Sequence, residues 1–207
     1  FFDPEFVDSY ELGLKATLLN GDLLLNTAVF YQEFTDFQLN TYDGISYKVA
    51  SIPLVVSRGV DTDFVWRTPI DGLRLQGGVT YAETQYGDFV PEAGVSPRLP
   101  NSRMSGAPLW SSSLSGSYER DLTESLAFRG SLSVRYTSSY NTGSNLDPIK
   151  VQDGFAQVNA RIGIGAPDKR WEVELWGANL TDETVAQVIF DPAFQTDMAS
   201  FLKHYVG

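Results

Sequence analysis

The clearest pattern of hydrophobic and polar positions lies between residues 110 and 136. Along most of this stretch, even-numbered positions are apolar or aromatic and odd-numbered positions are serine or charged. The large members are Trp110, Leu114, Tyr118, Leu126, Phe128, Leu132, Val134 and Tyr136. The alternation breaks only at a short polar turn, so it predicts a β-hairpin with one apolar and one polar face. Aromatic residues near both strand ends are typical of a membrane-spanning β-barrel.

Six further stretches read as strands, and with the hairpin they predict about eight antiparallel strands. They cover residues 7–19, 22–34, 54–67, 73–84, 154–165 and 171–180. The stretch 22–34 is nearly apolar on both faces, and its expected outer residues are Leu23, Leu25, Val29 and Tyr31. Residues 181–207 have no clear period.

The predicted connections alternate between short turns and long polar loops. Short turns occupy residues 20–21, 69–72 and 166–170, and long loops occupy 35–53, 85–108 and 138–152. Outer-membrane barrels have short turns on the periplasmic side and longer loops outside. The alternation therefore favours a transmembrane β-barrel over a soluble sandwich.

Tryptophans and charges support the same interpretation. Trp66, Trp110 and Trp171 lie near strand ends, where an indole ring suits the membrane interface. Ten charged side chains share the other strand face, which is too many for a dry core. They are Glu11, Lys15, Asp61, Arg67, Arg74, Arg129, Arg135, Arg161, Glu172 and Glu174. A water-filled lumen, a polar plug or an exposed face of a soluble sheet would each accommodate them.

The composition of the chain argues against several classes of structure and function. No segment reaches the roughly 18–20 apolar residues that a membrane helix needs. There is no cysteine and a single histidine, His204, so a multi-histidine metal or acid–base site is impossible within this chain. The net charge of −11 argues against nucleic acid as a partner. We expect no enzyme activity and no cofactor.

Several segments, in order along the chain, resemble the late barrel strands of TonB-dependent outer-membrane receptors. They are Pro4-Glu5, Ser9-Tyr10-Glu11-Leu12-Gly13-Leu14-Lys15, Asn20-Gly21, Ala28-Val29-Phe30-Tyr31, Ser57-Arg58-Gly59-Val60-Asp61, Pro69-Ile70-Asp71-Gly72-Leu73, Gly77-Gly78-Val79-Thr80-Tyr81, Ala107-Pro108-Leu109-Trp110 and Asn179-Leu180-Thr181-Asp182-Glu183. Asp61 stands where the family more often has glutamate. No single motif is specific, and the resemblance rests on the ordered set.

The resemblance implies a larger barrel of about 22 strands, filled by an N-terminal plug. It implies uptake of a scarce nutrient, such as a ferric siderophore, with energy from the TonB complex acting through the plug. Residues 1–207 would then be the C-terminal portion of the barrel, with the plug, the first half of the barrel and the last strand absent. The implied partners are outer-membrane lipid, the plug, the TonB complex and a small-molecule iron complex.

The start of the chain and the strand count agree with a fragment. Phe1-Phe2-Asp3-Pro4 has none of the features of a secretory signal, and the chain order favours an internal cut. Eight strands from a wide barrel leave two open edges, which hydrocarbon cannot solvate.

Two other functions remain open from the sequence. One is a complete eight-stranded outer-membrane barrel with a structural or adhesion role. The other is a soluble β-sandwich binding module. Cooperative folding without detergent would indicate the sandwich, whereas an upstream plug or a signal peptide just before residue 1 would separate the two barrels.

No catalytic, cofactor or metal site is predicted. The acid pairs Asp61 with Asp63 and Glu172 with Glu174 alternate along strands and read as solvated wall charges. The Asp- and Asn-rich loops lack calcium-ligand spacing and read as turns. Loop aromatics are the candidate ligand-binding residues: Tyr42, Tyr47, Tyr86, Phe89 and Tyr140.

Overall fold

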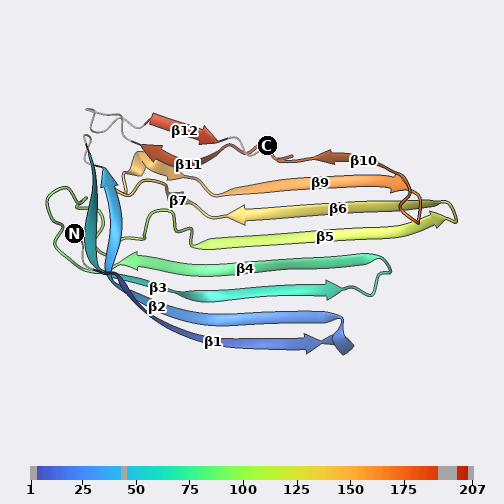
Figure 1. Ribbon diagram of the computed structural model, residues 1–207, viewed down its shortest axis with the longest axis horizontal. Coiled ribbons are helices and arrows are strands. Elements are labelled where there is room, and N and C mark those ends of the chain that lie inside the picture. The colour runs from blue at the N-terminus through green and yellow to red at the C-terminus, as the bar shows by residue number, and fades with distance from the viewer. Residues whose placement is uncertain (1–3, 43–45, 191–199, 205–207) are drawn as a thin grey trace.

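Eight strands of the computed structural model form one antiparallel sheet in which consecutive strands are neighbours (Figure 1). The structure describes residues 4–42, 46–190 and 200–204. The sheet strands are β1 (Phe6–Leu18), β2 (Leu23–Tyr42), β3 (Tyr47–Arg67), β4 (Leu73–Tyr86), β5 (Trp110–Thr123), β6 (Leu126–Thr137), β9 (Phe155–Gly165) and β10 (Glu172–Gly177). The predicted all-β, antiparallel fold class is confirmed.

Short elements complete the described structure. They are β7 (Tyr140–Asn141), β8 (Val151–Gln152), β11 (Val185–Phe190), β12 (Ser200–His204) and the 3-10 turns η1 (Leu19–Gly21) and η2 (Pro148–Lys150). β7 pairs with β8, and β11 pairs with β12. The sequence did not predict the last pair, because its two strands show no two-residue alternation and their pairing has an irregularity between Ala186 and Val188. Within the described ranges, no helix has the length and apolar character needed to cross a membrane.

The turns and loops separate to opposite ends of the sheet. The β1–β2, β3–β4, β5–β6 and β9–β10 connections are short and lie at one end, here named the turn end (Figure 1). At the first of them Asn20 and Gly21 adopt positive φ of 56° and 98°, as this dipeptide favours. The longer connections, 87–109 and 138–154, lie at the opposite end, here named the loop end.

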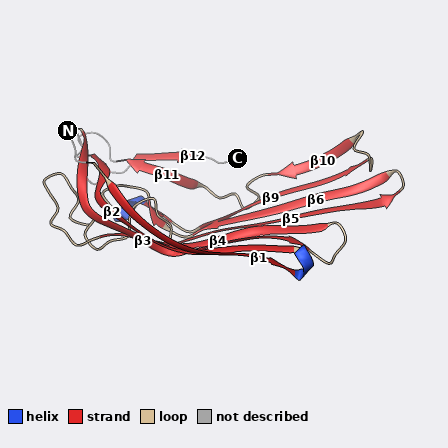
Figure 2. Cartoon of the chain, turned by 60° about the horizontal axis from the view of Figure 1, so that its bottom comes forward, coloured by secondary structure: helices blue, strands red, loops and turns tan. Residues whose placement is uncertain are grey.

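The predicted long loop over residues 35–53 is wrong, because β2 and β3 continue pairing to Tyr42 and Tyr47. Asp36 interrupts the strand with a φ of 56°, between the pairs Thr35–Leu54 and Phe37–Ile52. The kink places Asp36 opposite Pro53, which has no N–H to offer the ladder. Beyond it, the ends of β2 and β3 turn away from the plane of the sheet (Figure 2).

The register assigns a face to every strand residue, because directly paired residues of an antiparallel sheet point to the same side. One cross-strand row consists of Leu12, Val29, Val60, Tyr81 and Trp110. A neighbouring row on the opposite face consists of Asn26, Asp63, Gly78, Ser113, Arg135 and Gln157. The predicted outer residues of the second strand fall on the apolar face, and we call the other side the polar face.

The eight-stranded sheet is open. Within the described ranges, β1 pairs only with β2, and β10 pairs only with β9. These residues therefore form neither a closed eight-stranded barrel nor two large sheets packed face to face. The buried apolar cluster lies at the loop end and consists of Leu39, Ile52, Val55, Tyr86 and Leu99.

Candidate functional site

The apolar face carries large hydrophobic side chains that nothing within the described residues covers. Leu12 is 76% exposed and Leu175 is 71% exposed. Aromatic residues border this face toward both ends. They are Tyr10, Tyr31, Tyr81, Trp110 and Tyr136 toward the loop end and Phe64, Trp66, Tyr118, Phe128 and Trp171 toward the turn end. The Tyr81 and Trp110 rings are 4.8 Å apart. An exposed apolar band between two aromatic belts is the arrangement of a lipid-facing wall.

The polar face combines charges with small hydroxyl groups. Ser111, Ser113, Ser115 and Ser117 of β5 lie on this face, and Ser131 and Ser133 of β6 lie opposite the last two. A concave region of about 480 Å³ is lined by Ser113, Ser115, Ser133, Arg135, Gln157 and Asn159. Because ionised groups need water or a polar partner, this face borders a hydrated or protein-filled space.

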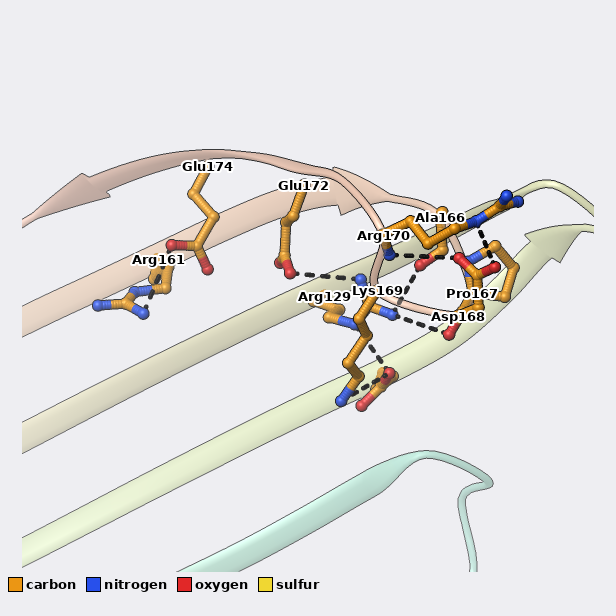
Figure 3. A network of polar contacts seen from close by, with 10 residues as sticks. Arg129, Arg161, Ala166, Pro167, Asp168, Lys169, Arg170, Glu172 and Glu174 are labelled. Carbon is orange, nitrogen blue, oxygen red and sulfur yellow. Dashed lines mark hydrogen bonds and ion pairs between the residues drawn. The ribbon is translucent and has the colours of Figure 1, made fainter.

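A network centred on Arg129 joins four segments near the turn end (Figure 3). Arg129 Nε donates to Glu119 Oε1 at 2.8 Å, and Nη1 lies 3.4 Å from Glu172 Oε2. Arg129 Nη2 donates to the carbonyl of Ala166 at 3.2 Å. Lys169 Nζ lies 3.7 Å from the same Glu119 oxygen. The Arg129 side chain is only 13% exposed. Its contacts link the β9–β10 turn to β5 and β6.

The buried cluster at the loop end anchors the 87–109 loop. Leu99 of this loop is fully buried beside Ile52 of β3. Met104 and Phe89 pack partly buried against the same cluster. The loop is thereby fixed to the bent ends of β2 and β3.

The 138–154 loop is joined to the 87–109 loop by hydrogen bonds and by an ion pair, in which Arg98 Nη1 lies 3.8 Å from Asp147 Oδ2. Ser96 Oγ donates to the Asn145 carbonyl at 2.7 Å, and Gly106 N donates to the Asn141 carbonyl at 2.7 Å. Arg103 Nη2 donates to the Ser139 carbonyl at 3.0 Å. The two loops therefore form one assembly above the polar face, which we call the loop assembly.

Lys150 is an internal cation of this assembly. Its side chain is 3% exposed, and Nζ donates to Asn145 Oδ1 at 3.1 Å. Asn145 Oδ1 also accepts from Asp147 N at 3.2 Å, and Asp147 Oδ1 accepts from Ile149 N at 3.1 Å. Sequence reasoning interpreted this Asn- and Asp-rich stretch as turns, which these bonds bear out. It gave no signal that the nearby lysine is buried.

The predicted ligand-binding aromatics occupy different environments. Tyr47 is 67% exposed on β3, whereas Tyr86 is 2% exposed in the buried cluster. Phe89 packs against that cluster. Tyr140 is half-buried on β7, and burial raises the pKa of its hydroxyl. The backbone of Tyr42 pairs with Tyr47, and the side chain of Tyr42 lies outside the described residues. The structure brings Tyr86 of β4 and Phe89 of the 87–109 loop together at the buried cluster.

Each carboxylate of the two acid pairs contacts another side chain of the sheet. Asp61 accepts from Thr80 Oγ1 at 2.5 Å, and Asp63 accepts from Asn26 Nδ2 at 2.9 Å. Glu172 and Glu174 contact Arg129 and Arg161. Among the described residues, no group of three or more His, Cys, Asp or Glu side chains has the geometry to hold a metal ion.

A sheet with one lipid-facing side, one polar side, short turns and long loops defines a wall segment of an outer-membrane β-barrel. The TonB dependent receptor-like β-barrel family model matches residues 1–180, and the chain belongs to this family. The protein is thus located in the bacterial outer membrane, with the turn end periplasmic and the loop end extracellular.

Solved structures of whole receptors contain the same fold. The ferric yersiniabactin uptake receptor FyuA of Yersinia pestis matches 98% of this chain with a TM-score of 0.77 and 17% identity. The siderophore receptor PiuA of Acinetobacter baumannii also matches 98%, with a TM-score of 0.70 and 16% identity. The ferripyoverdine receptor of Pseudomonas aeruginosa matches 91%, with a TM-score of 0.63 and 18% identity. The match spans 28%, 27% and 25% of those chains, respectively.

Proposed function

We propose that residues 1–207 are the C-terminal portion of a receptor barrel whose plug and first barrel half lie outside this chain. The open edges of β1 and β10 support this proposal. Each edge presents unpaired N–H and C=O groups, which hydrocarbon cannot hydrogen-bond. Further strands must therefore pair with both edges to close the barrel.

The function proposed for the whole receptor is TonB-dependent uptake of a scarce nutrient such as a ferric siderophore. The observation that carries it is that the lipid-facing sheet has a second, polar face, with the loop assembly at its loop end. Such a wall borders a route for a polar solute across the membrane. The structural neighbours described as ferric siderophore receptors point to an iron complex as the solute.

The proposed partners follow from this role. Outer-membrane lipid covers the apolar face, the plug fills the lumen, and the TonB complex acts through the plug. A small-molecule iron complex binds from the extracellular side. The chain acts as part of a transporter and not as an enzyme.

The residues proposed to form the ligand site, by contact or by supporting its loops, are Tyr42, Tyr47, Tyr86, Phe89 and Tyr140. The exposed ring of Tyr47 and the half-buried ring of Tyr140 are available for direct contact. The buried ring of Tyr86 and the partly buried ring of Phe89 act indirectly, because they hold the 87–109 loop at the buried cluster.

The test is uptake of radiolabelled iron by cells that express the full-length receptor as their single siderophore receptor. Energy-dependent uptake of at least one ferric siderophore is expected, and deletion of the tonB gene should abolish it. Surface binding of the same complex should persist in the deletion strain. Uptake that continues without TonB, or no uptake from a broad siderophore panel, would overturn the proposal.

A further inference from the structure

Charges are rare on the apolar face of the sheet. Between the kink at Asp36 and the turn end, the register of the described strands places these charged residues there: Asp8, Glu33, Arg58, Glu83 and Arg120. The first four lie toward the loop end. The cation among them is neutralised, because Arg58 Nη2 and Nε donate to Glu83 Oε2 at 2.7 and 2.9 Å. Arg120 lies apart from these four, near the turn end of β5.

Arg120 lies beside two aromatic rings. Its direct partner across the β5–β6 hairpin is Phe128, and the Tyr118 and Phe128 rings are 6.1 Å apart. The Tyr118 hydroxyl lies close to the guanidinium, whereas Asp71 of the β3–β4 turn acts on it only at longer range. Among the described residues Arg120 forms no ion pair with a carboxylate, and it is exposed. The guanidinium therefore keeps N–H donors for an acceptor outside this part of the chain.

The height of Arg120 matches the inner boundary of the membrane hydrocarbon. Arg120 lies ten residues after Trp110 on β5. This is about 33 Å of extended strand, or roughly 25 Å of height at the strand tilt of about 40° that outer-membrane barrels have. The apolar band of such barrels is about 25 Å tall. With Trp110 in the extracellular aromatic belt, Arg120 reaches the headgroups of the periplasmic leaflet.

We propose that Arg120 and Tyr118 form a binding site for the phosphate group of a glycerophospholipid in the periplasmic leaflet. The planar guanidinium presents paired N–H donors that match two phosphate oxygens, and the tyrosine hydroxyl adds a neighbouring donor. The acyl chains of the same lipid lie along the apolar face, where Leu114 and Leu132 are 50% and 51% exposed.

The distribution of charge selects this leaflet. At the loop end, the carboxylates of Asp8, Glu33 and Glu83 outnumber the single Arg58 and repel a phosphate. At the turn end, the charge that the apolar face presents is the unpaired cation of Arg120. The inference goes beyond transport, because it depends on which side of the sheet faces lipid and not on the solute that is carried.

Photocross-linking in the full-length receptor, reconstituted in phosphatidylcholine bilayers, tests the site. The probe is phosphatidylethanolamine with a photoreactive group on its headgroup nitrogen. It should label the segment 118–128, which contains Arg120 and both rings. The matched control probe is a diacylglycerol that carries the same photoreactive group without a phosphate. It should label this segment at least about fivefold less, because it cannot form charge-assisted hydrogen bonds.

Two charge variants complete the test. Arg120→Gln should lower phospholipid labelling of residues 118–128 at least about fivefold, since the amide is uncharged and lacks the paired donors. The control is Arg58→Gln, which removes an arginine from the same face at the opposite boundary. It should leave the labelling of this segment unchanged, because Glu83 already neutralises Arg58.

The two probes decide the question on the wild-type receptor even where a variant fails to fold. Equal labelling by both probes, or labelling unaffected by Arg120→Gln, overturns the site. Loss of labelling in millimolar inorganic phosphate would identify a site for free anions and overturn the lipid assignment. Iron uptake without the labelling overturns the lipid site alone, whereas the labelling without iron uptake overturns transport alone.

Discussion

Glu119 and Arg129 are direct cross-strand partners on β5 and β6, and Arg129 Nε donates to Glu119 Oε1 at 2.8 Å. The same guanidinium reaches Glu172 and the carbonyls of Ala166 and Pro167. One side chain thereby fixes the position of the β9–β10 turn relative to the β5–β6 hairpin.

Arg129→Met should destabilise the periplasmic end of the wall. It keeps much of the side-chain volume but removes hydrogen bonds to two carboxylates and two carbonyls, so we expect a loss of about 1–3 kcal/mol. The measurement is the unfolding of the full-length receptor in detergent, followed by its heat-dependent gel mobility. Arg170→Met, at the exposed tip of the same turn, is the control and should unfold like the wild type. Equal unfolding of both variants and the wild type would contradict the structural role of the network.

Leu132→Arg should impair assembly of the barrel. Leu132 is 51% exposed on the lipid-facing side, where an arginine near mid-membrane costs about 2–4 kcal/mol. Its neighbour Ser133 faces the polar side, so Ser133→Arg is the matched control. The measurement is the amount of folded receptor in outer-membrane fractions. Similar losses for both variants would contradict the assignment of the two faces.

Asn145→Ala should loosen the loop assembly. It removes the acceptor shared by Lys150 Nζ and Asp147 N, and a buried group that loses a partner costs about 1–3 kcal/mol. Hydrogen exchange should increase across residues 138–154 and remain unchanged in β4 and β5. Lys150→Met removes the buried charge together with its need for a partner and should have a smaller effect. A larger effect of Lys150→Met would assign the ordering role to the ammonium group.

Tyr47→Ala and Tyr140→Ala should each weaken binding of the ferric siderophore by a factor of about 5 or more, equivalent to roughly 1 kcal/mol for an aromatic contact. Equilibrium binding to the purified full-length receptor measures this change. Tyr86→Ala is expected to act differently, because its buried ring supports the loops. It should lower the thermal stability of the receptor along with its affinity. If Tyr47→Ala and Tyr140→Ala both left the affinity for the ferric siderophore unchanged, these two tyrosines would not belong to the ligand site.

The sequence predicted the wall of this protein well because each strand separates two different environments. The alternation in β5 and β6 follows directly from lipid on one side and a polar space on the other, so side-chain period alone identifies both strands and their facing. The short turns were equally predictable, since Asn20 and Gly21 adopt the positive φ that these residues favour.

Prediction failed where strands leave the two-sided wall. Phe37, Leu39 and Ile52 contribute to the buried cluster beneath the loops, so their chemistry reflects tertiary packing and not a strand period. The extension of β2 and β3 was missed for that reason. The burial of Lys150 was missed as well, because it depends on the fold of the surrounding loop and on the Asn145 side chain.

The pairing order of the sheet has a consequence for its biogenesis. Every strand from β1 to β5 pairs with the next strand along the chain, and within the eight-stranded sheet only the β6–β9 pair spans intervening strands. Closing short connections costs little chain entropy, and local pairing favours fast folding. The wall can therefore be laid down hairpin by hairpin, each one templated on the exposed edge of the hairpin before it.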